Sequence, residues 1–153
     1  MKKTITAIAL AGLLAGAGTA EAKPVTYEGK VTGGHKITFK RSGGKISKIN
    51  TGFATVCLPT SSFYGSNTGV DRFTPPGSYR LGKKVKRNKL QKTAMWHAKV
   101  TKYYTVSARK KGRRIKGKLE MSFSYGLPTM DYYGVHLITY ICHGTAKFSA
   151  KRR

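Results

Sequence analysis

Carboxylates are the scarcest chemical group in this sequence. The 153 residues contain 5 Asp and Glu against 30 Lys and Arg, which gives a formal net charge of +25. Calcium cages and related hard-cation sites need clustered carboxylates, so the composition excludes a protein of that class. Proline is also scarce, with 5 residues against 18 Gly, which is typical of a turn-rich β protein and not of a collagen-like or low-complexity chain.

Long hydrophobic runs are nearly absent. The one apolar run, residues 5–17, follows Lys2-Lys3 and ends near Ala20-Glu21-Ala22, a small-x-small cleavage pattern. The run is shorter than the roughly 20 residues needed to cross a bilayer. We therefore expect residues 1–22 to be a cleaved secretory signal and residues 23–153 to form a single exported domain, with an uncleaved anchor or a buried helix as the alternative. Because no Cys follows the run, we do not expect a lipid anchor.

Cysteine is limited to Cys57 and Cys142. In an oxidising compartment two cysteines allow only one intramolecular pairing, so we expect a disulfide between them. Closing a loop of this length stabilises a chain by roughly 4–5 kcal/mol in the chain-entropy account. The alternative is a metal or redox site with His143 as a further ligand. No C-x-x-C spacing is present and zinc normally takes four ligands, so we expect no metal and no cofactor.

The chain from residue 23 onward has the pattern of β-strands. Apolar and polar residues alternate over 118–125 and over 138–151, which is typical of half-buried antiparallel strands. Glycine pairs at 33–34 and 43–44, together with residues 110–113, predict turns. Residues 59–78 are rich in Ser, Thr, Gly and Pro, and we expect them to form one long loop. The prediction is an all-β fold, a single antiparallel sandwich or barrel with one disulfide.

Several short motifs carry a resemblance to a known family. They are Tyr27-x-Gly29-Lys30, Ile37-Thr38-Phe39, Gly44-Lys45-Ile46, Ile115-x-Gly117-x-Leu119 and the closing segment 142–152, which begins Cys-x-Gly-Thr-Ala-Lys-Phe. In these motifs the chain resembles a small secreted all-β domain of uncharacterised bacterial, largely actinobacterial, exported proteins. The resemblance implies a sandwich-like fold with Cys57 and Cys142 paired, and it implies no activity. The strongly basic region 80–102 departs from that pattern.

Positive charge is concentrated in two clusters. Between Asp71 and Glu120 no carboxylate occurs, whereas 17 of the 48 intervening residues are Lys or Arg. One cluster precedes and the other surrounds the predicted turn: Lys83, Lys84, Lys86, Arg87, Lys89 and Lys92, then Arg109, Lys110, Lys111, Arg113, Arg114, Lys116 and Lys118.

The aromatic residues Trp96, Tyr103 and Tyr104 lie between these clusters. Cations beside aromatic platforms suit single-stranded nucleic acid, because bases stack on rings while cations follow phosphates. The same cations suit anionic lipid or an acidic wall polymer. We therefore expect a secreted protein, in the extracellular space or cell envelope, that binds an extracellular polyanion. The alternative is a structural envelope or interaction module whose charge only keeps it soluble.

Histidines raise the alternative of a small secreted ribonuclease. Glu28 or Glu120 would act with His97 or His143 as general base and acid, and Lys or Arg would stabilise the charged phosphorane. The hydrolase, metalloprotease and phosphate-loop motifs are absent. Few carboxylates are available for the paired acids of a glycosidase. We therefore expect no catalytic residue and no enzyme activity.

Two aromatic pairs flank predicted turns, Phe63-Tyr64 and Tyr132-Tyr133. Exposed rings at the edge of a β domain can stack on sugars or lie in a membrane interface. Rings at the ends of a β domain can also cap the core, and that is the interpretation we favour for these pairs.

Overall fold

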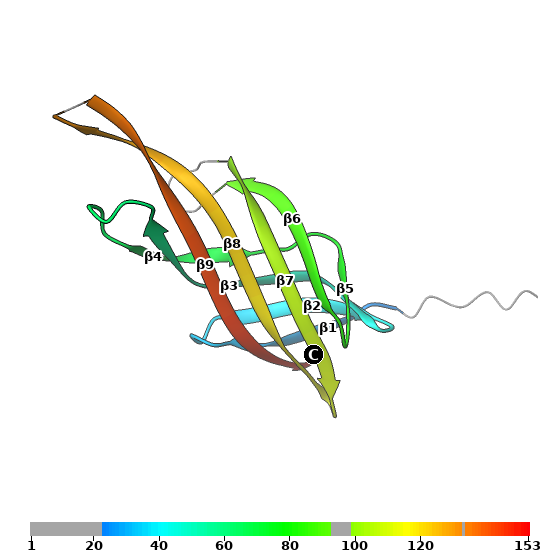
Figure 1. Ribbon diagram of the computed structural model, residues 1–153. Helices are drawn as coiled ribbons and strands as arrows, with labels where there is room; N and C mark the ends of the chain where they lie inside the picture. The colour runs from blue at the N-terminus through cyan, green and yellow to red at the C-terminus, as the bar shows by residue number, and fades with distance from the viewer. Residues whose placement is uncertain (1–22, 93–98, 133) are drawn as a thin grey trace, which may run out of the picture.

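The computed structural model describes residues 23–92, 99–132 and 134–153, so the predicted signal segment 1–22 lies outside the described residues. The described chain is built from β-strands joined by turns (Figure 1). In chain order they are β1 (Val25–Val31), β2 (Lys36–Ser42), β3 (Lys45–Pro59), β4 (Asn67–Phe73), β5 (Ser78–Arg80), β6 (Lys84–Lys92), β7 (Lys99–Lys111), β8 (Arg114–Asp131) and β9 (Gly134–Arg152).

All pairings are antiparallel and belong to one sheet, in the order β4-β3-β2-β1-β9-β8-β7-β6. Strand β5 pairs with β3, and β3 also pairs with β9 through Val56–Pro59 and Tyr140–His143. This extra pairing folds the sheet back on itself. The half formed by β6–β9 then crosses the half formed by β1–β4 (Figure 1).

The core lies between the two halves of the sheet. Phe73 of β4 contacts Tyr104 of β7, with ring centroids 5.1 Å apart, although these strands are not neighbours in the sheet. Phe39 of β2 contacts Phe148 of β9 at 5.8 Å. Each aromatic contact removes a large apolar area from water, so these pairs hold the two halves together.

Gly117 shows how closely the strands approach. It lies opposite Phe148 in the register of β8 and β9. A Cβ at this position would lie 2.3 Å from the Ser107 carbonyl oxygen and 2.6 Å from Cε1 of Phe148. Glycine is therefore required here, because any side chain would displace the Phe148 ring or the neighbouring strand.

The predicted all-β antiparallel fold is confirmed, and so is the disulfide. Cys57 and Cys142 are directly opposed in the register of β3 and β9, and their sulfur atoms are bonded. The predicted turns at 33–34 and 43–44 are present between β1 and β2 and between β2 and β3. The turn predicted at 110–113 is present between β7 and β8 but is limited to Gly112-Arg113, because Lys110 and Lys111 pair within the hairpin as part of β7.

One expectation about the fold is wrong. Residues 59–78 are not a single long loop, because strand β4 lies within this segment and pairs with Thr51–Cys57 of β3. Phe73 is fully buried and Asp71 nearly so. The short β4 shows only a partial alternation, and its partner supplies the register.

Candidate functional site

The two basic clusters share one face of the sheet. Directly opposed residues of antiparallel strands project to the same side, and the register opposes Lys84 to Ser107 and Ser107 to Lys118. On the other side of β7 lie the buried residues Val106 and Ala108. Alternate residues of β6–β9 therefore face away from the core, and we call this surface the outer face.

Seven of the predicted cations project from the outer face, where they are exposed: Lys84, Lys86, Arg109, Lys111, Arg114, Lys116 and Lys118. Lys83 and Arg113 lie in the turns before β6 and β8. The register gives Arg87, Lys89 and Lys110 the opposite orientation. The side chain of Lys92 lies outside the described part of the chain.

Two further cations at this end of the outer face were not predicted, and a third unpredicted cation, Lys99, is exposed on the same face at the other end of β7. Lys147 is opposed to Lys118, and Lys151 is opposed to Arg114. Their alternation with the buried Ala146, Phe148 and Ala150 gave the signal in the sequence. We call the seven predicted cations together with Lys147 and Lys151 the basic end of the outer face.

Glu120 joins the two clusters. Its Oε1 lies 2.7 Å from Nζ of Lys118 on β8, and its Oε2 lies 3.4 Å from Nζ of Lys84 on β6. The hydrogen bond from Lys118 is the main cause that lowers the pKa of the Glu120 carboxyl below its usual value, against a smaller opposing effect of burial. The carboxylate therefore stays charged while it neutralises part of the basic end.

An open hollow lies within the basic end. Its volume is about 500 Å³, and the charged side chains lining it are Arg109, Lys111, Lys116, Lys118 and Lys147. They come from three adjacent strands, and Gly117 and Ala108 also line the hollow. Arginine binds phosphate or carboxylate groups through two parallel hydrogen bonds, so the hollow suits repeated anionic groups.

The predicted aromatic platform is only partly present. Tyr103 projects from the outer face and is 55% exposed, between Asn88 of β6 and Ser122 of β8. Tyr104 is 0% exposed, because its parity on β7 points it into the core, so its assignment as a platform is wrong. Burial raises the pKa of its hydroxyl. Trp96 lies outside the described residues.

Of the residues named for a ribonuclease, the structure brings only Glu120 and His143 near each other among the described residues. Glu28 lies on β1 and pairs with Lys36 at 2.7 Å, and His97 lies outside the described residues. Glu120 and His143 share the outer face, because Glu120 is opposed to Thr145 and Ser122 to His143. They are thus diagonal neighbours, and a ring nitrogen of His143 lies 3.1 Å from Oγ1 of Thr145.

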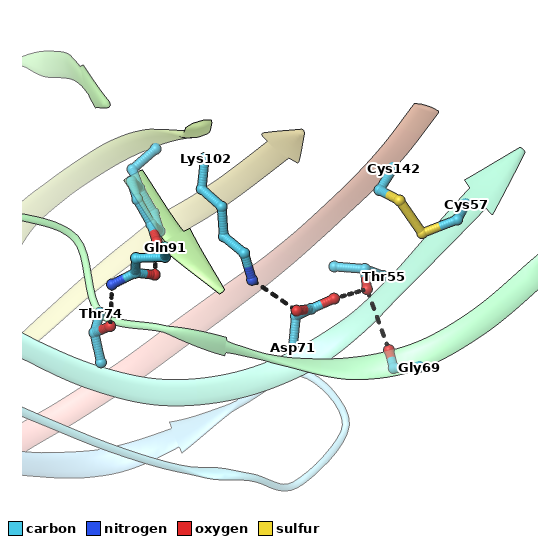
Figure 2. A network of polar contacts seen from close by, with 9 residues as sticks. Thr55, Cys57, Gly69, Asp71, Thr74, Gln91, Lys102 and Cys142 are labelled. Atoms are coloured by element: carbon cyan, nitrogen blue, oxygen red, sulfur yellow. Dashed lines mark hydrogen bonds and ion pairs between the residues drawn. A yellow bond between two sulfur atoms is a disulfide. The ribbon is translucent and has the colours of Figure 1, made fainter. Parts of the chain in front are cut away.

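A buried ion pair escaped the sequence analysis. Nζ of Lys102 on β7 lies 2.7 Å from Oδ1 of Asp71 on β4, and Oγ1 of Thr55 donates to Oδ2 at 2.7 Å. Figure 2 shows the Lys102 and Asp71 side chains pointing toward each other across the core, near the disulfide. Lys102 is 2% exposed, so this lysine of the basic region 80–102 belongs to the core and not to a binding surface.

The polar core continues beside this pair. Gln91 Nε2 donates to Oγ1 of Thr74 at 3.1 Å (Figure 2), and the Tyr104 hydroxyl contacts Oε1 of Gln91. Nζ of Lys102 also lies 4.6 Å from the centre of the Phe123 ring. The Gln91 contacts join β6 and β7 to Thr74, which directly follows β4, and the Lys102 contact joins β7 to β8, so these groups have a structural role.

The end of the outer face away from the cations is apolar. The register there opposes Leu58 of β3 to Ile141 of β9, and Val56 to His143. Farther along the β8–β9 hairpin it opposes Pro128 to Leu137 and Met130 to Val135. We call this surface the apolar end: Val56, Leu58, Met130, Val135, Leu137 and Ile141, all of them exposed.

Our preferred interpretation of the aromatic pairs is wrong for two residues. Phe63 and Tyr132 are almost fully exposed, and Tyr132 lies at the tip of the β8–β9 hairpin. Tyr64 is half-buried against the core as expected, and Tyr133 lies outside the described residues. Turn positions carry no alternation, so the sequence did not reveal which rings are buried.

Among residues 23–92, 99–132 and 134–153 no group of three or more His, Cys, Asp or Glu side chains is placed to hold a metal ion. Within the same described ranges no helix is long and apolar enough to cross a membrane.

Comparisons with family models, with curated proteins and with solved structures found no match.

Proposed function

We propose that this protein is exported and binds an extracellular polyanion through the basic end of its outer face. The observation that carries the proposal is the convergence of both basic clusters on one surface, where Lys84 and Lys118 share the carboxylate of Glu120. A chain with charges scattered over all sides would attract anions without a defined site. The disulfide supports an oxidising compartment, because such bonds persist there and are rare in the cytosol.

The position of Glu120 also supports the proposal, because Lys84 and Lys118 can exchange its carboxylate for an anionic ligand. An anionic ligand that enters the hollow can replace the Glu120 carboxylate as the partner of Lys84 and Lys118. Exposed ion pairs contribute little to folding, so this exchange costs the fold little. A ligand cannot reach the buried Lys102–Asp71 pair in this way, because Lys102 is 2% exposed.

The proposal is tested by anisotropy of labelled dextran sulfate and labelled single-stranded RNA, titrated across salt concentration with the oxidised protein. The test variant is Lys116→Gln/Lys118→Gln/Lys147→Gln on the outer face. The matched control, Lys45→Gln/Lys48→Gln/Lys89→Gln, removes the same charge elsewhere. Each lost ionic contact lowers the slope of log K against log salt by about 1, so we expect a fall of about 2–3 in the test variant alone. Equal falls of the slope in both variants would show that the polyanion is attracted by the net charge and not by the basic end.

A ribonuclease is the second candidate, and the diagonal placement of Glu120 and His143 favours it. The Glu120 carboxylate would take the proton of a 2′-hydroxyl, whose oxygen attacks phosphorus. His143 would protonate the departing 5′-oxygen, which leaves a 2′,3′-cyclic phosphate. The RNA samples of the titration are run on a gel. Cleavage that His143→Gln abolishes supports this candidate, and intact RNA at full occupancy rejects it.

A further inference from the structure

The β8–β9 hairpin extends beyond the strands beside it. Strand β7 pairs with β8 only as far as Ser122, and β3 pairs with β9 only from Tyr140 onward. Residues 126–131 and 134–138 therefore pair only with each other, whereas Thr139 also accepts a hydrogen bond from the Thr60 amide at 2.8 Å. Figure 1 shows this part of the hairpin projecting past the sheet. We call residues 126–132 and 134–138 the arm.

One side of the arm is apolar and exposed. Met130, Val135 and Leu137 share the side that continues the outer face, and they are 82%, 66% and 72% exposed. The other side carries Thr129 and His136, and at its base Ile138 is buried and Leu127 half-buried against the core. At the tip Tyr132 is 97% exposed. Contiguous exposed apolar surface marks an interaction site in a soluble protein.

The apolar surface does not end with the arm. It continues onto Ile141, then across the β9–β3 pairing onto Leu58 and Val56. His143, Ser122 and Tyr103 follow along the same face, and beyond them the basic end begins. Along β3, β8 and β9 this face is thus apolar at one end and cationic at the other, with Lys99 of β7 an exposed cation outside the basic end.

We propose that this face docks on an anionic lipid bilayer, with the arm inserted at the interface and the basic end against the headgroups. The inference rests on the proposed function, because the basic end supplies the attraction to the headgroups. A bilayer matches both ends, since it combines negative charge with an apolar interior. The Tyr132 ring at the tip suits the interface, where amphipathic aromatic side chains gather.

The charge and chemistry of the two ends argue against other occupants. A second copy of the chain carries the same formal charge of +25 and would be repelled. Nucleic acid offers bases that stack on aromatic rings, whereas the arm offers Met130, Val135 and Leu137 with a single described ring, Tyr132, at its tip. A wall polymer of sugars and phosphates offers no apolar interior. The bilayer is the partner that covers both ends.

The test is co-sedimentation of the oxidised protein with vesicles of phosphatidylcholine containing 30% phosphatidylglycerol, and with vesicles of pure phosphatidylcholine. The arm variant is Val135→Thr/Leu137→Thr. It replaces two exposed apolar side chains with polar ones, and threonine is β-branched and therefore compatible with a strand. The matched control is His136→Thr on the opposite side of the arm. We expect binding to the anionic vesicles to fall about tenfold or more in the arm variant, and to be unchanged in the control.

Binding of soluble dextran sulfate separates the two proposals. We expect the arm variant to bind dextran sulfate like the wild type. If the arm variant also binds anionic vesicles like the wild type, the docking inference is wrong while the proposed function stands. If the wild type binds neither dextran sulfate nor vesicles, both are wrong. Sedimentation of the wild type as an arm-dependent dimer, without vesicle binding, would replace the bilayer with a second copy of the chain.

A second readout reports insertion directly. In Tyr132→Trp the new indole lies at the tip, and its fluorescence is compared with that of the wild type, which contains only Trp96. We expect a blue shift on anionic vesicles and quenching by lipids brominated near the headgroup end of the chain. An unchanged spectrum with vesicles bound would show that the arm stays in water, and would overturn the inference.

Discussion

Two lysine–carboxylate pairs in this protein have the same contact distance and opposite surroundings. Lys102 and Asp71 lie 2.7 Å apart in the core, and Lys118 and Glu120 lie 2.7 Å apart on the outer face. The Lys102 side chain is 2% exposed, and that of Lys118 is 49% exposed. Distance alone would give both pairs the same role, whereas burial separates them.

The difference lies in what replaces a lost partner. Water and salt ions can solvate Lys118, so an exposed pair contributes about 0–1 kcal/mol to stability. Lys102 has no such access, and removing its partner leaves a charge in the core at a cost of about 3–5 kcal/mol. The buried pair therefore holds β4 against β7, and the exposed pair is available for exchange with a ligand.

Breaking the buried pair gives the largest expected effect. Asp71→Asn keeps the shape of the side chain but removes the charge that balances Lys102. We expect the free energy of unfolding to fall by about 3–5 kcal/mol in urea titrations of the oxidised protein. Addition of 1 M NaCl should recover little of the loss, because salt does not reach the site. A loss below about 1 kcal/mol would place this pair in the same class as the exposed one.

Replacing both partners sharpens the same point. In Lys102→Met/Asp71→Val neither charge is buried, and Thr55 keeps the Gly69 carbonyl as an acceptor at 3.3 Å. Apolar replacements of buried ion pairs are often neutral or stabilising, so we expect stability within about 1–2 kcal/mol of the wild type. The urea midpoint measures it. Dextran sulfate affinity should be unchanged, and a fall would link the core pair to the binding face.

The sequence predicted most of the cations around the exposed pair, but it did not predict the buried pair. The turn at 112–113 fixes the register of β7 and β8, so the shared face of Arg109, Lys116 and Lys118 follows from alternation alone. The placement of Lys84 depends on how β6 meets β7, which no local pattern shows. The Lys102–Asp71 contact depends on how the two halves of the sheet pack, and alternation on β7 is what turns Lys102 inward.

The disulfide and the arm show the same limit. With two cysteines the pairing followed from the count, and the register of β3 and β9 confirmed it. In the arm, Val135 and Leu137 alternate like core residues of a strand. The sequence could not show that the strands beside them end early, so the exposure of these side chains emerged only from the three-dimensional arrangement.

Removing the exposed carboxylate has a smaller expected effect on stability than breaking the buried pair, and it strengthens the binding of a polyanion. Glu120→Gln frees Lys84 and Lys118 and removes a negative charge from the basic end. We expect the free energy of unfolding to change by less than about 1 kcal/mol, while the affinity for dextran sulfate rises a few-fold at low salt. The control is Glu28→Gln on β1, which removes the same charge beside Lys36. An equal gain in both variants would attribute the effect to net charge.

The pH dependence of the Glu120→Gln effect is the smallest expected effect. It shows whether the change in affinity comes from the charge of the carboxylate. The pKa of Glu120 is lowered in the folded protein, first by the Lys118 hydrogen bond. Its ion pairs therefore stabilise the fold above the unfolded value of about 4.5, and this contribution is lost as the pH falls through the lowered folded pKa. Below that point the wild type has a neutral side chain at position 120, as Glu120→Gln has at every pH.

The affinity difference between wild type and Glu120→Gln should therefore be constant from pH 6 down to about 4.5 and should vanish at lower pH. Dextran sulfate keeps its charge over this range, so the difference reports the protein alone. Circular dichroism at each pH shows whether the fold persists. A difference that persists after the Glu120 carboxyl has been protonated would mean that the substitution acts through shape, and the exposed pair would then resemble the buried one after all.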